Sequence, residues 1–360
     1  MKRILCLIES LGSGGAERQM TGLAVMLKQA GYQVEVLYYV NKEFYLPYLH
    51  EHGVAARYLA DASSPKKRFF ALKNYINEYA PDTIISYSVS SNMICCLLKL
   101  FGAKFNLIVS ERNTTQEITL RVRSRFCLYR WADHIVPNSY SQAAFIEHWY
   151  PRLMPKVKVI TNFVDTDKFS PLNLKVEHID KCTNIVSVGR IVPQKNILTF
   201  IQAVARVIAD GYKVHVDWFG YDLKDEYSKE CHKLIKDNNL EEIFVFHPAS
   251  HSIEEEYRKA DVFCLPSIYE GFPNVLCEAM CCGKPVLCSR VCDNPKIVSE
   301  GQNGLMFDPL SVDDMAMSIQ RFLDIPDEAK LKMGEISLDI AHNLFSKDIF
   351  ISKYKSIIKF

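Results

Sequence analysis

Short apolar runs alternate with helical patterns along this chain, and the alternation restarts after a polar stretch. In the first half the strand-like runs are residues 4–8, 34–40, 83–86, 107–110, 134–137 and 157–160, and residues 16–31 form the first helical segment. In the second half such runs are residues 184–188, 214–219, 243–246, 262–265 and 285–288. Strands separated by helices pair in parallel. The pattern therefore predicts an α/β chain with two doubly wound sheets.

The polar stretch 162–181, which contains Pro171, separates the two halves. We predict a first domain over residues 1–163, a linker over 164–181 and a second domain over 182–344. Residues 345–360 form an amphipathic helical pattern that we expect to pack back toward the first domain. A chain of 360 residues is long enough for two domains. Two such sheets facing each other would form a cleft at the carboxyl ends of their strands.

Composition and the placement of apolar residues predict the cellular compartment of the protein. The content of 48% apolar and 24% charged residues is typical of a soluble globular protein. The N-terminal apolar run stops before Glu9, short of the ~7–15 residues of a signal peptide, and no window reaches the ~18 apolar residues of a membrane span. The 12 cysteines include a group from Cys277 to Cys292 that lacks Cys-x-x-Cys spacing and a nearby His. We expect a cytoplasmic protein with reduced thiols and no metal site.

Charge is distributed unevenly along the chain. Residues 1–170 carry 21 Lys and Arg against 14 Asp and Glu, whereas the remainder carries 22 against 28. Two basic stretches of the first half are interleaved with aromatic residues, which suits an anionic membrane surface. Their cations are Lys66, Lys67 and Arg68, and Arg121, Arg123, Arg125 and Arg130. The alternative is that they lie on solvated helix faces. No nucleic-acid-binding module accompanies them, so we expect no nucleic-acid partner.

The segment most informative for function is Glu270-Gly-Phe-Pro-Asn-Val-Leu-Cys-Glu278. Gly and Pro after the first carboxylate predict a loop that enters a helix near Phe272 or Pro273, with Glu278 about two turns into it. Open N–H groups at a helix N-terminus favour an anion such as a diphosphate. Ionised carboxylates accept hydrogen bonds from sugar and ribose hydroxyls. The spacing therefore predicts a nucleotide-sugar site.

A second candidate loop is Gly189-Arg190-Ile-Val-Pro-Gln-Lys195-Asn196, which follows the first strand of the second half. Two cations five positions apart at the carboxyl end of a strand can hold a diphosphate from two sides. Loop cations are often merely solvated. Arg190 and Lys195 nevertheless share a domain with Glu270 and Glu278, and this favours the binding interpretation.

The loop Ser10-Leu-Gly-Ser-Gly-Gly-Ala-Glu17 joins the first strand to the first helix. Gly14 and Gly15 would let the backbone approach a phosphate or substrate closely. A tight strand-to-helix turn explains them about equally well. The loop is a poor dinucleotide fingerprint, because Glu17 replaces the third glycine and the second strand runs into Asn41 without an acidic residue. An NAD-dependent oxidoreductase is therefore disfavoured.

Two further motifs have competing interpretations. In Ser110-Glu-Arg-Asn113, Glu111 or Arg112 could meet an acceptor or a departing phosphate, or could form a surface ion pair. Asp165-Thr-Asp167 resembles a metal-binding Asp-x-Asp motif, but it lies in the linker, so we expect a turn or cap residue and no metal. None of the 10 His residues stands out as a catalytic base.

Together these residues resemble the retaining glycosyltransferases of family 4. Members of this family have the GT-B fold, in which two Rossmann-like domains face a central cleft. The resemblance rests on Glu270 and Glu278, on Gly189-Arg190 with Lys195, on the glycine turn and on residues 162–165. It continues through Glu278-Ala-Met-Cys-Cys-Gly-Lys-Pro-Val and Glu300-Gly-Gln-Asn-Gly304, and it covers essentially the whole chain.

The resemblance implies transfer of a sugar from a nucleotide-sugar, preferably UDP-linked, to a sugar acceptor on a membrane-anchored lipid diphosphate. Arg190 and Lys195 would hold the donor diphosphate, Glu278 the ribose hydroxyls, and Glu270 the transferred sugar. Further contacts are implied for Gly271, Phe272, Pro273, Asn274, Val275, Gly15 and Gly189 on the donor side and for Gly14 on the acceptor side. The resemblance also implies retention of configuration, no metal and no other cofactor. The protein would work peripherally at the inner membrane face in polysaccharide or oligosaccharide synthesis.

Three positions depart from the family pattern. Arg112 stands where many relatives place His, Gly220-Tyr-Asp222 replaces the usual Gly-x-Gly, and Asn294 and Lys296 replace Gly and Glu. The role of that His therefore does not carry over, and the donor base and sugar stay open. Two alternatives are kept: a GT-B sugar-nucleotide epimerase, which needs no acceptor, and a nucleotide-sugar-binding protein without catalytic activity.

Overall fold

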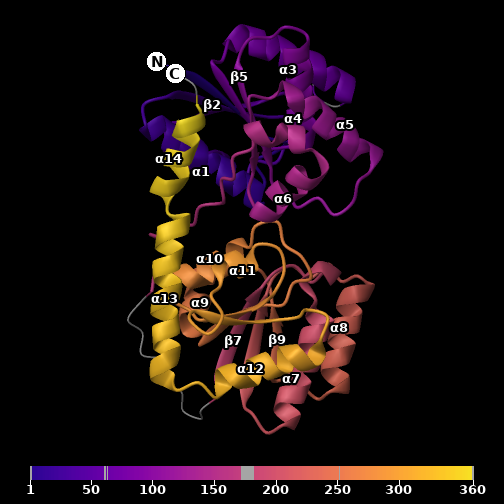
Figure 1. The fold of residues 1–360 in the computed structure, drawn as a ribbon, viewed down its shortest axis with the longest axis vertical. Helices are drawn as coiled ribbons and strands as arrows, with labels where there is room; N and C mark the ends of the chain where they lie inside the picture. The colour runs from indigo at the N-terminus through magenta and orange to yellow at the C-terminus, as the bar shows by residue number, and fades with distance from the viewer. Residues whose placement is uncertain (1, 61, 63, 172–181, 251, 359–360) are drawn as a thin grey trace. The chain divides into compact units, whose positions relative to one another are not determined.

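The computed structural model describes residues 2–60, 62, 64–171, 182–250 and 252–358, so residues 172–181 of the predicted linker lie outside it. The chain divides into two compact units, one made of Met1–Phe163 with Lys347–Phe360 and the other of Val164–Ser346. Each unit is built on a six-stranded parallel sheet flanked by helices (Figure 1). The prediction of two doubly wound α/β sheets is confirmed.

In the first unit the strand order is β3-β2-β1-β4-β5-β6, and neighbouring strands are parallel. The strands are β1 (Arg3–Leu7), β2 (Gln33–Tyr38), β3 (Ala55–Tyr58), β4 (Thr83–Ser86), β5 (Asn106–Glu111) and β6 (His134–Pro137). The helices are α1 (Gly15–Gln29), α2 (Leu46–Glu51), α3 (Pro65–Tyr79), α4 (Val89–Leu100), α5 (Leu120–Leu128), α6 (Tyr140–Trp149) and α14 (Lys347–Ile357), with the 3-10 helices η1 (Tyr129–Trp131) and η2 (Pro151–Lys156).

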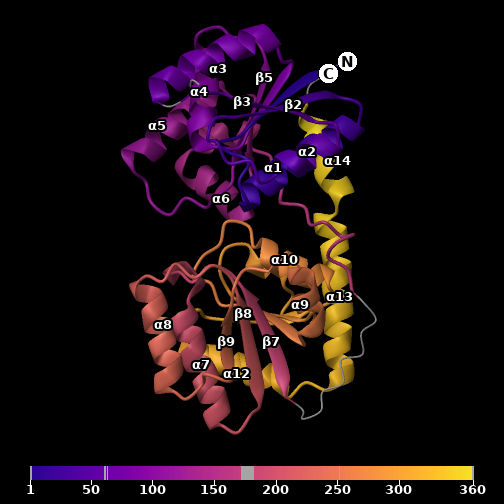
Figure 2. The ribbon, with the colours of Figure 1, turned by 180° about the vertical axis from the view of Figure 1, so that it is seen from behind.

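Alternate strand residues of the first unit supply two cores. Ile4 and Cys6 of β1 pack with α1, α2 and α14, whereas Leu5 and Leu7 pack with α3, α4, α5 and α6. Figure 2 shows these two groups of helices on opposite sides of the sheet. This alternation follows from the period of two along a strand. Buried on both faces, the central strands β1 and β4 carry apolar runs at residues 4–7 and 84–85, as is typical of parallel sheets.

The second unit repeats this plan with the strand order β12-β11-β10-β7-β8-β9. Its strands are β7 (Thr183–Val188), β8 (Val214–Phe219), β9 (Phe244–His247), β10 (Val262–Leu265), β11 (Val286–Ser289) and β12 (Gly304–Phe307). Its helices are η3 (Pro193–Lys195), α7 (Ile197–Ala209), α8 (Glu226–Asp237), α9 (Ile253–Lys259), α10 (Asn274–Cys281), α11 (Asn294–Ile297), α12 (Val312–Leu323) and α13 (Asp327–Phe345). Helices α7, α8 and α12 pack on one face, and α9, α10 and α13 on the other.

Local capping explains where many of these helices begin. A side-chain oxygen at the N-cap position accepts a hydrogen bond from the backbone N–H three residues later, which satisfies one of the donors left open at a helix start. The residues that cap in this way are Ser64, Ser88, Thr119, Ser139, Asp225 and Ser311. Among the described residues, no helix has the length and apolarity that crossing a bilayer would require.

The C-terminal helix begins two residues later than predicted. Phe345 ends α13, Ser346 is extended with ψ 153°, and α14 starts at Lys347. Phe350, Tyr354 and Ile357 of α14 are buried in the core that α1 also lines. The hydroxyl oxygens of Tyr354 and Tyr87 are 2.6 Å apart. The amphipathic C-terminal segment therefore belongs to the first unit.

One strand prediction was wrong, and two strands were not predicted. Residues 157–160 form no strand, and only Val157 makes an isolated bridge, to Ile135. Strand β3 went unpredicted because three of its four residues are exposed, as suits an edge strand without an apolar run. Strand β12 is fully buried, but it begins with Gly304 and spans four residues, which leaves little periodicity to recognise.

Candidate active site

Four loops of the second unit meet at the carboxyl edge of its sheet. They follow β11, β10, β7 and β8, which are consecutive neighbours in the sheet. Because these strands are parallel, their carboxyl ends lie along one edge. The loops after β7 and β10 carry Arg190, Lys195 and Glu270. Residues predicted for donor binding are thus brought to a common edge.

Lys195 and Glu270 form a largely buried ion pair at this edge. Lys195 Nζ lies 2.6 Å from Glu270 Oε1, and the two side chains are 15% and 9% exposed. Ser267 Oγ donates a hydrogen bond to the same carboxylate oxygen at 2.7 Å. Pairing and hydrogen bonding compensate charges that are withdrawn from water. Both side chains were predicted as site residues, but their mutual pairing was not.

Glycines let the loops beneath this pair pack closely. A Cβ at Gly220 would lie 1.9 Å from the Gly189 carbonyl oxygen, and a Cβ at Gly189 would lie 2.9 Å from Lys195 Cε. Trp218 Nε1 donates to the Gly189 carbonyl oxygen at 2.8 Å. The aliphatic part of Lys195 therefore passes over Gly189. Gly189 shapes the site through this packing, while its direct contact with a donor stays a prediction.

Arg190 contrasts with Lys195 although it lies on the same loop. Arg190 is exposed, and within the described ranges its guanidinium has no hydrogen bond or ion pair. A guanidinium carries five N–H donors in a geometry that matches phosphate and carboxylate groups. Arg190 thus offers an unused positive charge beside the buried pair.

Helix α10 carries the second predicted carboxylate. It begins at Asn274 with Pro273 as its N-cap residue and no side-chain cap, so it starts next to the predicted point. Glu278 is the fifth residue of α10, about one turn from its start, and the expected two turns were wrong. Its side chain is largely covered, because Glu278 is 3% exposed and accepts a hydrogen bond from Tyr257 at 3.3 Å.

The remaining predicted residues of this segment divide into core and loop. Phe272 is 6% exposed and packs against Phe345 of α13 with ring centroids 5.5 Å apart, so its side chain belongs to the core. Pro273 is buried as well, whereas Gly271, Asn274 and Val275 are partly exposed. Any donor contact of these five residues through the backbone stays a prediction.

Sequence reasoning missed the residues that support Glu270. Ser289 Oγ donates to the Ser267 carbonyl at 2.6 Å, and Asn294 Nδ2 donates to the Ser289 carbonyl at 2.8 Å. The Glu270 backbone N–H is 3.4 Å from Cys292 Sγ, and Cys292 has a φ of +50°. A left-handed backbone conformation at a residue other than glycine costs free energy, and such residues are found preferentially at functional sites. The signal available in the sequence was Asn294, a departure from the family pattern.

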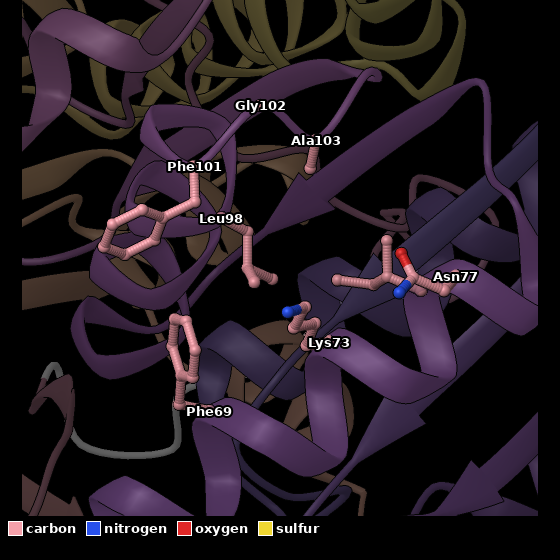
Figure 3. A pocket seen from close by; sticks show the side chains of 8 residues that line it. Phe69, Lys73, Asn77, Leu98, Phe101, Gly102 and Ala103 are labelled. Atoms are coloured by element: carbon pink, nitrogen blue, oxygen red, sulfur yellow. The ribbon is translucent and has the colours of Figure 1, made fainter.

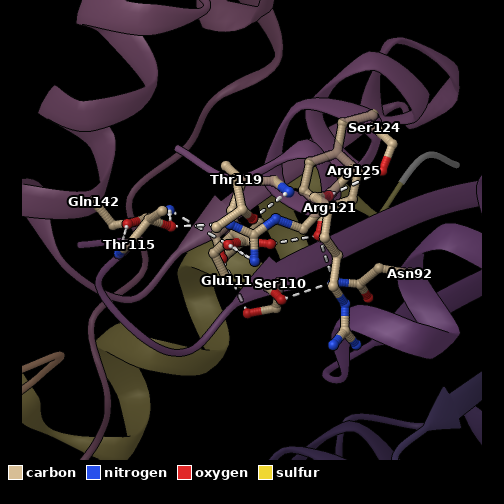
Figure 4. Close-up of polar contacts among 12 residues, drawn as sticks. Asn92, Ser110, Glu111, Thr115, Thr119, Arg121, Ser124, Arg125 and Gln142 are labelled. Atoms are coloured by element: carbon tan, nitrogen blue, oxygen red, sulfur yellow. Dashed lines mark hydrogen bonds and ion pairs between the residues drawn. The ribbon is translucent and has the colours of Figure 1, made fainter. Parts of the chain in front are cut away.

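Glu111 of the first unit is enclosed rather than available to a substrate. It is 2% exposed and pairs with Arg125 at 3.3 Å, and it also accepts hydrogen bonds from Tyr129 and Gln142 (Figure 4). Burial raises the pKa of this carboxyl above its usual range, against the effects of Arg125 and Tyr129. The ion pair that the sequence offered as an alternative is present, but it is buried rather than on the surface, because α5, α6 and η1 supply the partners of Glu111. Contact of Glu111 with an acceptor or phosphate stays a prediction.

Arg112, the next residue, has no carboxylate partner among the described residues. Its Nη2 donates to Asn162 Oδ1 and its Nη1 to Ser110 Oγ at 3.3 Å. Its Cζ lies 4.4 Å from the centre of the Tyr87 ring, and its Nε is buried without a hydrogen-bond partner. Arg112 is therefore a fixed cation at the carboxyl end of β5 whose charge is not neutralised by these neighbours.

The glycine turn is explained by local packing. Helix α1 begins at Gly15, and Gly14 is its N-cap residue with φ −77°, which other residues adopt as readily. A Cβ at Gly14 would lie 2.3 Å from Glu17 Oε2, and Ser10 Oγ donates to Glu17 Oε1 at 3.1 Å. A larger residue at 14 would therefore only require the flexible Glu17 side chain to shift. Contacts of Gly14 and Gly15 with a substrate stay predictions.

Two members of the basic stretches point inward, which corrects their assignment to a membrane surface. Arg125 is buried against Glu111. Arg68 lies 4.1 Å from the Tyr39 ring and donates to Ala62 and Ser90. The other cations remain exposed, namely Lys66, Lys67, Arg121, Arg123 and Arg130.

The Asp-x-Asp segment and the cysteines have structural roles. Asp165 Oδ1 accepts a hydrogen bond from the Asp167 N–H at 3.3 Å, a local turn as predicted. No cluster of His, Cys, Asp and Glu suited to a metal ion occurs within the described ranges. The cysteines are all free thiols, and burial raises the pKa of Cys96 and of Cys282 to about 12. These thiols are therefore packed in the core.

Comparisons with known proteins agree with this architecture. Residues 13–168 match the model of Glycosyltransferase Family 4, and residues 173–337 match that of Glycosyl transferases group 1. The N-acetylgalactosamine-N,N'-diacetylbacillosaminyl-diphospho-undecaprenol 4-alpha-N-acetylgalactosaminyltransferase of Campylobacter jejuni is 28% identical over 80% of this chain and 81% of its own. A second C. jejuni enzyme, which adds N-acetyl-D-galactosamine to a diNAcBac-PP-undecaprenol glycan, is 27% identical over 78% of this chain and 77% of its own.

The fold also matches solved structures. The Anabaena protein HepE, solved in complex with UDP, superposes with a TM-score of 0.87 at 20% identity, covering 99% of each chain. A sucrose-phosphate synthase of Thermosynechococcus elongatus superposes with a TM-score of 0.82 at 19% identity, covering 99% of this chain and 98% of its own. At these identities the likeness shows a shared fold, and the expected GT-B architecture is confirmed.

Proposed function

Since the chain belongs to the glycosyltransferases with the GT-B fold, we propose that it is a retaining, metal-independent enzyme. Its donor is a UDP-sugar, and its acceptor is a sugar carried on a lipid diphosphate in surface polysaccharide or oligosaccharide synthesis. The two C. jejuni relatives, whose names specify undecaprenyl-diphosphate acceptors, support this acceptor class. The UDP complex of HepE supports the nucleotide.

The observation that carries the proposal is the Lys195–Glu270 pair beside the unpaired Arg190. In the proposed reaction the bond between the sugar C1 and the diphosphate breaks, and a bond from C1 to the acceptor oxygen forms on the same face. Negative charge develops on the departing UDP, where Arg190 and Lys195 stabilise it. The proton of the acceptor hydroxyl passes to the departing phosphate, which serves as the base.

Carboxylates orient the donor in this proposal. Glu270 accepts hydrogen bonds from hydroxyls of the transferred sugar and holds Lys195 in place. Glu278 accepts hydrogen bonds from the ribose hydroxyls in this proposal, because an ionised carboxylate is a pure acceptor. Because two cations neutralise the leaving group, no metal ion is required in the proposed mechanism, and addition of EDTA leaves turnover unchanged.

On the acceptor side we assign the acceptor diphosphate to Arg112. Its guanidinium is held by Tyr87, Ser110 and Asn162 and has no carboxylate among its described neighbours. A fixed, uncompensated cation favours a phosphate anion. The exposed Lys66, Lys67, Arg121, Arg123 and Arg130 would hold the first unit against the anionic inner face of the membrane that carries the acceptor.

Calorimetric titration with UDP and with GDP, in the presence of EDTA, tests the donor assignment. We expect UDP to bind the wild type, and Glu278→Ala to bind it with about 10- to 100-fold lower affinity, because a hydrogen bond to a charged group contributes roughly 1.5–3 kcal/mol. Unchanged affinity in the variant would contradict the ribose assignment. Tight binding of GDP alone would contradict UDP. Release of UDP only after a lipid-linked acceptor is added would separate transfer from epimerisation.

A further inference from the structure

A pocket of about 320 Å³ opens between helices α3 and α4 of the first unit, away from the carboxyl edge of the sheet. Its walls combine the apolar side chains of Phe69, Ile76, Leu98 and Phe101 with the polar side chains of Lys73 and Asn77. Figure 3 shows the Lys73 ammonium group facing the space beside Phe69 and Leu98. Ligand sites commonly combine an apolar wall with a few convergent polar groups in about this volume.

The surface around the pocket exposes aromatic side chains. Phe101 is 73% exposed, Phe70 is 51% exposed and Leu100 is 41% exposed. The rings of Phe69 and Phe101 stand nearly perpendicular, with centroids 6.4 Å apart. Single exposed apolar residues are ordinary, but a continuous group at a pocket marks an interaction site.

The charges at this surface are positive and unpaired. Lys66, Lys67, Lys73 and Lys104 are exposed, and their ammonium groups have no ion pair within the described ranges. The exposed acid of α3 is Glu78, five positions after Lys73 and thus about 140° around the helix. The neighbouring Arg68 is turned inward, so it does not add to this surface. Lysines around an apolar pocket are complementary to a lipid with an anionic headgroup.

We propose that the α3–α4 pocket binds one anionic phospholipid of the bilayer, which docks the first unit on the membrane. The lipid phosphate binds Lys73, and the start of an acyl chain occupies the space between Phe69, Leu98 and Phe101. Phe70 and Phe101 enter the headgroup region. This inference rests on the proposed function, because a lipid-linked acceptor requires the enzyme to work at a membrane surface. It adds a specific lipid site to a general electrostatic attraction.

Titration of the full chain with dihexanoylphosphatidylglycerol below its critical micelle concentration tests the site. Because this lipid is then monomeric, its binding reports a specific site and not attraction to a charged membrane surface. We expect saturable binding of one lipid per chain, and weaker binding of dihexanoylphosphatidylcholine. Lys73→Gln should lower the phosphatidylglycerol affinity about fivefold. Ala103→Trp should abolish binding by filling the pocket, and Phe101→Ser tests the same wall at an exposed position. The matched control Lys236→Gln changes an exposed lysine of α8 and should bind as the wild type does.

Absence of saturable binding, or equal binding by Lys73→Gln, Phe101→Ser and the wild type at unchanged melting temperature, would overturn the proposal. Binding of an oligoribonucleotide at the same residues in preference to the lipid would also overturn it. Transfer to a water-soluble acceptor analogue, measured without lipid, separates the two ideas. Transfer without lipid binding overturns the lipid site alone, whereas lipid binding without transfer supports this site and contradicts the proposed function.

Discussion

Two buried carboxylates of this molecule each face a cation, and their surroundings differ. Glu111 is the last residue of β5 in the first unit and is bound by Arg125, Tyr129 and Gln142, which lie on helices. Glu270 follows a strand of the second unit and is bound by Lys195 and Ser267 from loops. The loop of Lys195 also carries the exposed Arg190.

The difference shows that burial and a perturbed pKa do not by themselves mark a site. The pKa of Glu111 is raised by desolvation, which would nominate it as a functional residue. The oxygens of Glu111 nevertheless already accept hydrogen bonds from buried side chains of the first unit. Glu111 therefore stabilises the packing of this unit. At Glu270 the pairing is provided by residues of two loops, and one of these loops also carries the exposed Arg190, whose positive charge is left for a ligand.

The largest expected effect is on the free energy of unfolding, when the buried Glu111–Arg125 ion pair is broken. Arg125→Ala leaves Glu111 buried without its cation, and breaking a buried pair in this way costs about 3–5 kcal/mol. Urea unfolding should show this loss in the free energy of unfolding. The double variant Glu111→Gln/Arg125→Met removes both charges and should recover most of it. A double variant as unstable as Arg125→Ala would show that packing of the Arg125 stem, rather than its charge, braces the unit.

Arg190→Ala should lower turnover and leave the stability of the protein nearly unchanged. Because Arg190 is exposed and unpaired, the free energy of unfolding should stay within about 0.5 kcal/mol of the wild type. Turnover should fall about 100- to 1,000-fold, because the charge developing on the leaving diphosphate loses a preorganised donor. Steady-state kinetics and thermal melting on the same preparations measure both. Parallel losses of melting temperature and turnover would make Arg190 structural.

Gly189→Ala tests whether the position of Lys195 matters. The added Cβ would come within 2.9 Å of Lys195 Cε, so the lysine must shift along Glu270. We expect turnover to fall about tenfold, as for a displaced catalytic group, with a small change in stability. Gly211→Ala is unsuitable as a control because Gly211 has a φ of +90°. Equal turnover of Gly189→Ala and the wild type would contradict a positional role.

Most of the fold could be predicted because buried parallel strands are apolar runs with helices between them. Residues 83–86, 134–137, 214–219 and 262–265 were predicted with the bounds that the structure has. The failures share a physical cause. Ala55–Tyr58 is an exposed edge strand, and residues 157–160 are apolar but pair through a single bridge. In both, tertiary context rather than local pattern decides the structure.

The sequence predicted which residues belong to the candidate site, but it did not predict the contacts between them. Lys195 and Glu270 were recognised separately, but their pairing joins positions 75 residues apart, which no local pattern reports. The same limit produced the error at Arg125, since a charged residue in a basic stretch is predicted to be exposed unless its buried partner is known. Ser267 and Ser289 were missed because single serines in loops carry no distinguishing pattern.

The smallest expected effect is a pH dependence at Glu111. Because its folded-state pKa lies above the ordinary 4.5, the folded protein binds this proton more readily than the unfolded chain does. The stabilisation is complete below about pH 4.5 and is lost as pH rises through the folded-state pKa, with a slope of at most about 1.4 kcal/mol per pH unit. Glu111→Gln removes this titration. Urea unfolding of both proteins across acidic to neutral pH should therefore show the wild type losing stability relative to the variant as pH rises. A difference that grows in the opposite direction would mean that the Arg125 charge outweighs burial at Glu111.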